Sequence, residues 1–97
     1  MSQRTSLFLF ANLGSEISKI FSAKKTHNTS MFERAMTNAE SIISELKTIP
    51  DTKDNQEVDI LKDIVQDFKE IKPKYNIPRE DFEAYFYPFA LKIMQQQ

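Results

Sequence analysis

The sequence predicts an all-α protein that folds as a compact four-helix bundle in a single domain, residues 1–97. Four stretches carry apolar residues at the spacing of an amphipathic helix, and short connections join them. The chain holds one glycine, whereas hairpins and β-sandwiches use glycine at their turns. Ninety-seven residues also leave no room for a second domain.

The first helix is predicted at about residues 6–23. Its apolar face consists of Leu9, Phe10, Leu13, Ile17, Ile20 and Phe21. The run SLFLFA resembles a buried strand in its hydrophobicity, but it contains no β-branched residue, so a helix is the better interpretation. A polar loop, SAKKTHNT, is expected next.

The second helix is predicted at about residues 30–49. Ser30 and Glu33 have the S-x-x-E spacing of a capping box, in which each side chain bonds an amide that the helix leaves unpaired. Pro50 should end the helix, because a proline pushes the preceding residue out of the α region. Its apolar face consists of Phe32, Ala35, Met36, Ala39, Ile42, Ile43, Leu46 and Ile49.

The third helix is predicted at about residues 54–72, with Asp54 and Glu57 as a second capping box and Pro73 as its stop. Its apolar face consists of Val58, Leu61, Ile64, Val65, Phe68 and Ile71.

The fourth helix is predicted at about residues 77–95. Pro78 suits its first turn, where Glu80 and Asp81 complement the helix dipole. Its main apolar face consists of Phe82, Tyr85, Phe86, Phe89 and Ile93.

Composition and motifs favour a non-enzymatic cytoplasmic protein without a cofactor. The net charge of −1 gives no basic excess for nucleic acid, and the absence of cysteine excludes disulfides and thiolate zinc sites. The apolar run from Leu7 to Ala11 is too short to span a membrane. His27 is the only histidine and lies in a polar stretch. No nucleophile elbow, phosphate loop, metal motif or other catalytic signature accompanies it, so we expect neither catalytic nor metal-binding residues.

The segment YFYPFAL, residues 85–91, gives the fourth helix a second apolar side. Tyr87, Leu91 and Met94 project away from the face that contains Phe82. Pro88 removes an amide that would bond the preceding turn, so the helix should bend there. Either the helix is wedged among the other three, or its spare side contacts another subunit or a partner protein.

The first helix carries a small-residue strip beside its apolar face, formed by Ala11, Gly14, Ser15 and Ser18. Glycine inside a helix costs about 1 kcal/mol relative to alanine, which close approach of another helix would justify. That helix belongs either to the same bundle or to a second copy of the chain.

Four acidic residues recur at helical spacing along the third helix: Asp59, Asp63, Asp67 and Glu70. A solvated face, a contact for a basic partner and a divalent-cation site are the three interpretations. The first is the most common outcome, and the last lacks the enclosing ligands that Mg²⁺ or Ca²⁺ needs.

Basic residues and one tyrosine surround the connection between the third and fourth helices: Lys69, Lys72, Lys74, Tyr75 and Arg79. Together they could hold a phosphate backbone beside a stacking ring, although lysine-rich loops are usually only solvated.

The segments ANLGSE (residues 11–16), FERAM (residues 32–36) and YFYPFA (residues 85–90) resemble a family of small all-helical bacterial and archaeal proteins. Some members of that family are similar in turn to accessory helical bundles found near the reverse transcriptases of diversity-generating elements. The resemblance implies an oligomeric protein that binds nucleic acid and the polymerase. Since this chain is slightly acidic, protein contact is the part of that function that we expect it to share.

The sequence therefore leads to two hypotheses. The first is an adaptor that binds another protein or itself, as a homo-oligomer, through the first and fourth helices. The second is a nucleic-acid-associated accessory protein that uses the basic residues before the fourth helix.

Overall fold

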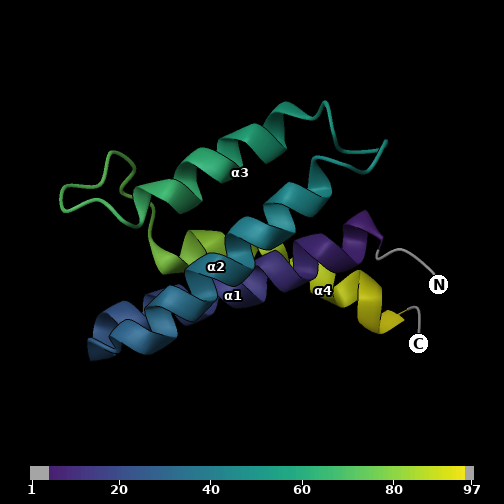
Figure 1. The fold of residues 1–97 in the computed structure, drawn as a ribbon. Coiled ribbons are helices and arrows are strands. Elements are labelled where there is room, and N and C mark those ends of the chain that lie inside the picture. The colour runs from purple at the N-terminus through teal and green to yellow at the C-terminus, as the bar shows by residue number, and fades with distance from the viewer. Residues whose placement is uncertain (1–4, 96–97) are drawn as a thin grey trace.

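The computed structural model describes residues 5–95 and confirms the four-helix prediction. Its helices are α1 (Ser6–Thr26), α2 (Thr29–Leu46), α3 (Gln56–Asp67) and α4 (Arg79–Gln95) (Figure 1). No β-strand occurs within these residues.

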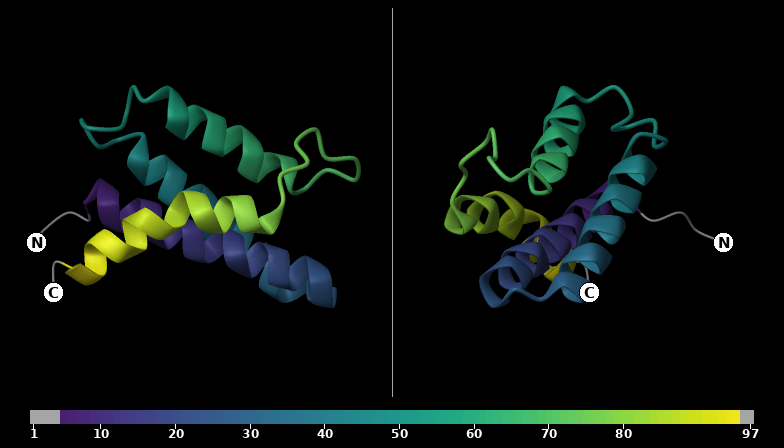
Figure 2. Two further views of the ribbon diagram at one scale, coloured as in Figure 1. Left: turned by 180° about the vertical axis from the view of Figure 1, so that it is seen from behind. Right: turned by 60° about the vertical axis from the view of Figure 1, so that its left-hand side comes forward.

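The helices form a bundle around α1. The backbones of α2 and α4 both lie close to α1, and α3 lies close to α2. α4 runs antiparallel to α1, so that its last turn lies near the first turn of α1, and its ribbon curves between its two ends (Figure 2). α3 and α4 have no comparable close contact between their backbones, so one side of the bundle is less tightly closed.

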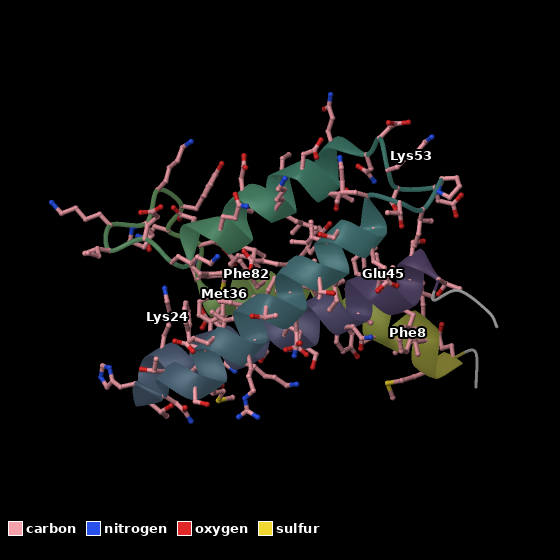
Figure 3. The ribbon with its side chains drawn as sticks, viewed as in Figure 1. Phe8, Lys24, Met36, Glu45, Lys53 and Phe82 are labelled. Atoms are coloured by element: carbon pink, nitrogen blue, oxygen red, sulfur yellow. The ribbon has the colours of Figure 1, made fainter. Side chains whose placement is uncertain are left out.

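The core lies where α1 meets its neighbours. Leu9, Leu13, Ile17 and Ile20 of α1 are at most 1% exposed. Figure 3 shows Met36 and Phe82, from α2 and α4, pointing into the interior. The remaining buried apolar residues of the core cluster are Phe10, Ala35, Ala39, Ile42, Ile43, Leu46, Val58, Leu61, Val65 and Phe86. The helical periodicity of the sequence predicts nearly all of these positions.

The connection between α1 and α2 is shorter than the sequence analysis predicted. α1 continues to Thr26, because Ala23 is buried and the Thr26 hydroxyl donates to the Ser22 carbonyl at 2.9 Å. His27 then ends the helix with φ 56° and ψ 36°, a left-handed conformation that is common just after a helix. Asn28 caps α2 by accepting from the Met31 amide at 3.0 Å, so the predicted capping box at Ser30 is wrong.

α2 ends three residues before the predicted position, at Leu46 rather than residue 49. The hydroxyl of Thr48 donates to the Glu45 carbonyl at 2.7 Å, and the buried hydroxyl of Thr52 donates to the Leu46 carbonyl at 2.5 Å. These bonds satisfy the last carbonyls of the helix. α2 therefore ends four residues before Pro50, so the proline is not what terminates it.

α3 begins and ends inside its predicted bounds. Its cap is Asn55, whose side chain accepts from the Glu57 amide at 2.8 Å, so the predicted box at Asp54 is wrong. The helix ends at Asp67 rather than residue 72. α4 starts at Arg79, and the carbonyl of Pro78 accepts from Asp81 and Phe82.

Candidate protein-binding surface

The outer face of α4 is an exposed apolar surface, which we define as Tyr87, Leu91 and Met94 with Ala84 and Ala90 beside them. Tyr87 is 63% exposed, Leu91 37% and Met94 68%, and both alanines are exposed. No charged residue occurs between Ala84 and Leu91. The helical register placed these side chains away from the Phe82 face and left open whether other helices cover them; in the structure they are exposed.

Aromatic packing on the opposite side fixes the orientation of α4. Phe10 of α1 and Phe89 of α4 stack with ring centroids 4.8 Å apart. Phe82 lies 5.5 Å from the Phe21 ring and 5.9 Å from the Phe68 ring, both measured between centroids. Since these contacts hold the phenylalanines of α4 against α1 and the end of α3, Tyr87 and its neighbours face solvent.

The small-residue strip of α1 is occupied by α4 of the same chain. A Cβ atom placed on Gly14 would lie 2.6 Å from the Cβ of Phe86. The hydroxyl of Ser18 accepts from Arg79 Nη2 at 2.9 Å, and Ala11 is half-buried. The close approach that justifies Gly14 is therefore the α1–α4 contact within one bundle. Gly14 and Ser18 are partly buried, and the contacts described for them are made with α4 of the same chain, so the candidate surface is narrower than the sequence predicted.

Arg79 joins the first turn of α4 to α1. In addition to the Ser18 hydroxyl, its Nη2 donates to the Ser22 hydroxyl at 3.1 Å and the Ser18 carbonyl at 3.3 Å. Its Nε lies 3.5 Å from the Glu83 carboxylate. An arginine held by these groups is a structural residue and is poorly placed for a phosphate.

The other predicted nucleic-acid residues do not form one basic patch. Lys69 pairs with Glu40 of α2 at 2.8 Å. Lys74 lies over the ring of half-buried Tyr75, with Nζ 5.6 Å from its centroid. Lys72 is exposed. Two of the four cations are thus paired with acceptors from the same chain, which weakens the case for a phosphate-binding surface.

The acidic residues of the third predicted helix also separate. Asp59 pairs with Lys47 at 2.6 Å, Asp63 is exposed, and Glu70 lies beyond the end of α3. Asp67 is only 9% exposed. They therefore do not form one continuous acidic face.

Asp67 holds the connection between α3 and α4. Its two carboxylate oxygens accept from the amides of Lys74 and Tyr75, both at 2.8 Å. The bond from Tyr75 is the largest cause that lowers the pKa of Asp67; burial opposes it, and the Lys74 amide and charge add to it. Asp67 is thus a structural residue that sequence analysis assigned to a surface.

Lys24 is a further link between elements. Its Nζ lies 5.3 Å from the centroid of the Phe68 ring and 5.9 Å from that of Phe32, and Figure 3 shows the side chain directed toward the end of α3. Cation–π contacts of this kind contribute about 0.5–1 kcal/mol at exposed sites.

Among residues 5–95, the helices are too short or too polar to cross a lipid bilayer. In the same part of the chain, no three histidine, aspartate or glutamate side chains gather into a set that could hold a metal ion.

Comparisons of the chain with known protein families, curated proteins and solved structures give no match. The resemblance to the accessory-bundle family therefore stays a prediction.

Proposed function

We propose that this protein is a non-enzymatic, cytoplasmic interaction module that associates with a second copy of itself through the outer face of α4. The observation that supports the proposal is the exposure of Tyr87, Leu91 and Met94 on a helix that is already apolar on its buried side. Large apolar residues that are exposed next to one another on one face often mark a contact surface. Tyrosine and methionine are also enriched in such surfaces.

A second copy is a suitable occupant because the face can be complementary to itself. Two α4 helices that pair antiparallel about a twofold axis would place the Tyr87 ring of each copy against the Leu91 side chain of the other. Opposed helix dipoles favour this arrangement, and a net charge of −1 per chain adds little repulsion. Twofold pairing of identical surfaces is also the most common form of self-association.

The size of the face sets the expected affinity. α4 has 17 residues, so it is about 25 Å long, and a helix is about 10 Å wide. One side of it buries far less than the roughly 800 Å² per partner of a standard interface. We therefore expect a weak dimer with a dissociation constant in the micromolar range or above.

Sedimentation equilibrium over a concentration series up to about 1 mM tests the proposal. The wild-type chain should shift toward the dimer mass, and Tyr87→Lys and Leu91→Lys should stay monomeric with unchanged helical content. Ile71→Lys is the matched control, because Ile71 is 97% exposed in the connection after α3. A wild-type chain that is monomeric throughout, or a control that dissociates equally, contradicts the proposal.

The nucleic-acid alternative has less support, because Arg79 and Lys69 are engaged within the chain. Retardation of a single-stranded oligonucleotide in a gel at low salt, lost on raising the salt, would favour it.

A further inference from the structure

A second apolar surface lies between α3 and α4, where the bundle is open. These helices make no close backbone contact of the kind seen between the other neighbours. Between them is a groove of about 200 Å³, here called the α3–α4 groove. Its lining residues are Glu57, Ile60, Leu61, Ile64, Ile77, Asp81, Phe82 and Tyr85.

The groove is lined mainly by apolar side chains. Leu61 and Phe82 are buried beneath it, while Ile60 is 53% exposed on its wall. A cavity of about 160 Å³ under the connection between the helices shares Ile64, Ile77 and Phe82 with the groove. The bonds from Asp67 hold that connection in place.

Two carboxylate residues line the groove and lie at its opposite ends. α3 and α4 run in opposite directions (Figure 1). Glu57, in the first turn of α3, is therefore at the end far from the connection, whereas Asp81, in the first turn of α4, lies at the near end. Both carboxylates are on exposed residues, and no basic partner contacts either within the described residues.

The separation of the two carboxylates determines which arrangement of basic residues on a bound segment would be complementary to them. The α3 residues that line the groove run from Glu57 to Ile64, seven positions along the helix, so the groove is about 10 Å long on this side. A helix laid along the groove would meet the two carboxylates with basic residues about two turns apart. Aliphatic side chains between them, on the same face, would cover Ile60 and Ile64.

Tyr85 adds an unused polar group. Its phenol oxygen is buried and has no hydrogen-bond partner among the described residues. A buried hydroxyl without a partner is unfavourable, so this side of α4 is not fully satisfied by the contacts within the chain.

We propose that the α3–α4 groove binds an amphipathic helical segment of a different protein, with two aliphatic residues between basic residues at i and i+7. A second copy of this chain is a poor source of such a segment. Among the described residues, lysine or arginine pairs spaced i, i+7 occur at Lys72 and Arg79, which fall mostly in the connection before α4, and at Lys62 and Lys69. Val65 between them is fully buried. The proposal does not depend on the outer face of α4.

The test uses two synthetic helical peptides and NMR of the full-length chain labelled with ¹⁵N. One peptide carries leucines at i+3 and i+4 and lysines at i and i+7, and the other has glutamates in place of the lysines. The lysine peptide should shift the amide signals of Ile60, Ile64 and Tyr85 in a saturable way. The glutamate peptide should bind at least about tenfold more weakly, because it places like charges together.

Matched variants separate the apolar and the charged contributions. Ile60→Ser should weaken binding of the lysine peptide severalfold, whereas Ile71→Ser, outside the groove, should not change it. The double variant Glu57→Gln, Asp81→Asn should weaken it by about 2- to 30-fold and reduce its dependence on salt.

Several results would overturn the proposal. These are no saturable shift at about 1 mM lysine peptide, equal binding of both peptides, or shifts confined to Tyr87, Leu91 and Met94. Groove signals that instead change on dilution of the chain alone would show that a second copy occupies the groove. Monomeric behaviour in sedimentation with intact peptide binding would contradict only the proposed self-association.

Discussion

Gly14→Ala should destabilise this protein, although the same change inside most helices is stabilising. Gly14 is the only glycine in the chain and lies where α1 meets α4. An added Cβ would be 2.6 Å from Phe86 Cβ and 2.7 Å from Phe86 Cγ, whereas carbon atoms pack best at about 3.5–4.0 Å. A displacement of about 1 Å is therefore needed.

The displacement cannot come from rotation of the phenylalanine ring alone. The closest atom, Phe86 Cβ, is attached to the backbone of α4, so that α4 itself must move away from α1. The bonds of Arg79 to Ser18 and the stacking of Phe10 on Phe89 oppose this movement. We therefore expect a cost near the upper end of the usual range for overpacking, about 3 kcal/mol.

Helix propensity offsets part of this cost. Alanine is better than glycine by about 1 kcal/mol inside a helix, so the net loss of unfolding free energy should be about 2 kcal/mol. For a domain of this size, that corresponds to a fall in Tm of about 8–16 °C.

Thermal and urea unfolding followed by far-UV circular dichroism measures the effect. The adjacent residue Ser15 is exposed and supplies a matched control. The difference in unfolding free energy between Ser15→Ala and Ser15→Gly measures the difference in helix propensity between alanine and glycine in the same helix, without the contact to Phe86. If Gly14→Ala is as stable as the wild type or more stable, the tight α1–α4 contact is refuted.

Two further predictions concern the ends of helices. Asp67→Asn should destabilise the protein at neutral pH. Because folding lowers the pKa of Asp67 from its ordinary value of 3.8, the carboxylate stabilises the fold fully above that pH and progressively less as the pH falls below it. The difference in unfolding free energy between variant and wild type, measured by urea unfolding, should therefore become smaller below that pH. A gap that is unchanged by acid would contradict this role. Asn28→Ala should lower the unfolding free energy by about 1 kcal/mol through loss of the α2 cap, whereas Ser30→Ala should be close to neutral; the reverse order would restore the predicted capping box.

Sequence periodicity was sufficient for the helices and the core because both depend on local spacing. The 3- and 4-residue spacing of apolar residues was enough to predict the buried faces of α1 and α2. The same register gave the direction of Tyr87 and Met94, across the helix from Phe82, but their exposure depends on which helices pack against α4 and was known only from the fold.

The ends of the helices were harder to predict, because single hydrogen bonds decide them. Asn28, Thr52 and Asp67 each end or begin an element through a side chain that bonds the backbone. Asparagine at a cap was a visible signal. The Thr52 hydroxyl donates to the Leu46 carbonyl, and Asp67 accepts from the amides of residues 74 and 75. These bonds depend on how the chain turns, and no sequence pattern predicts them.

Long-range contacts explain what sequence analysis missed about the surfaces. Arg79 looked like a cation available for phosphate, but Ser18 and Ser22 lie about sixty positions earlier in the chain and bind it. The α3–α4 groove was not predicted from the sequence, because its lining residues Ile60 and Tyr85 are far apart in the chain and lie close together only in the folded structure. The spacing of Glu57, Ile60 and Ile64 on one side of a helix was the available signal.

The composition of α4 links both proposals. A helical segment that is apolar on every side, as residues 84–91 of α4 are, is normally covered on every side. Among the described helices, however, the backbone of α4 lies close to that of α1 alone. Two residues along a helix turn the side chain by about 200°, so Tyr85 lines the groove while Tyr87 faces almost the opposite direction. Self-association through Tyr87 would therefore leave the α3–α4 groove open in each copy. A dimer formed this way would present two peptide-binding grooves and could hold two partner segments together.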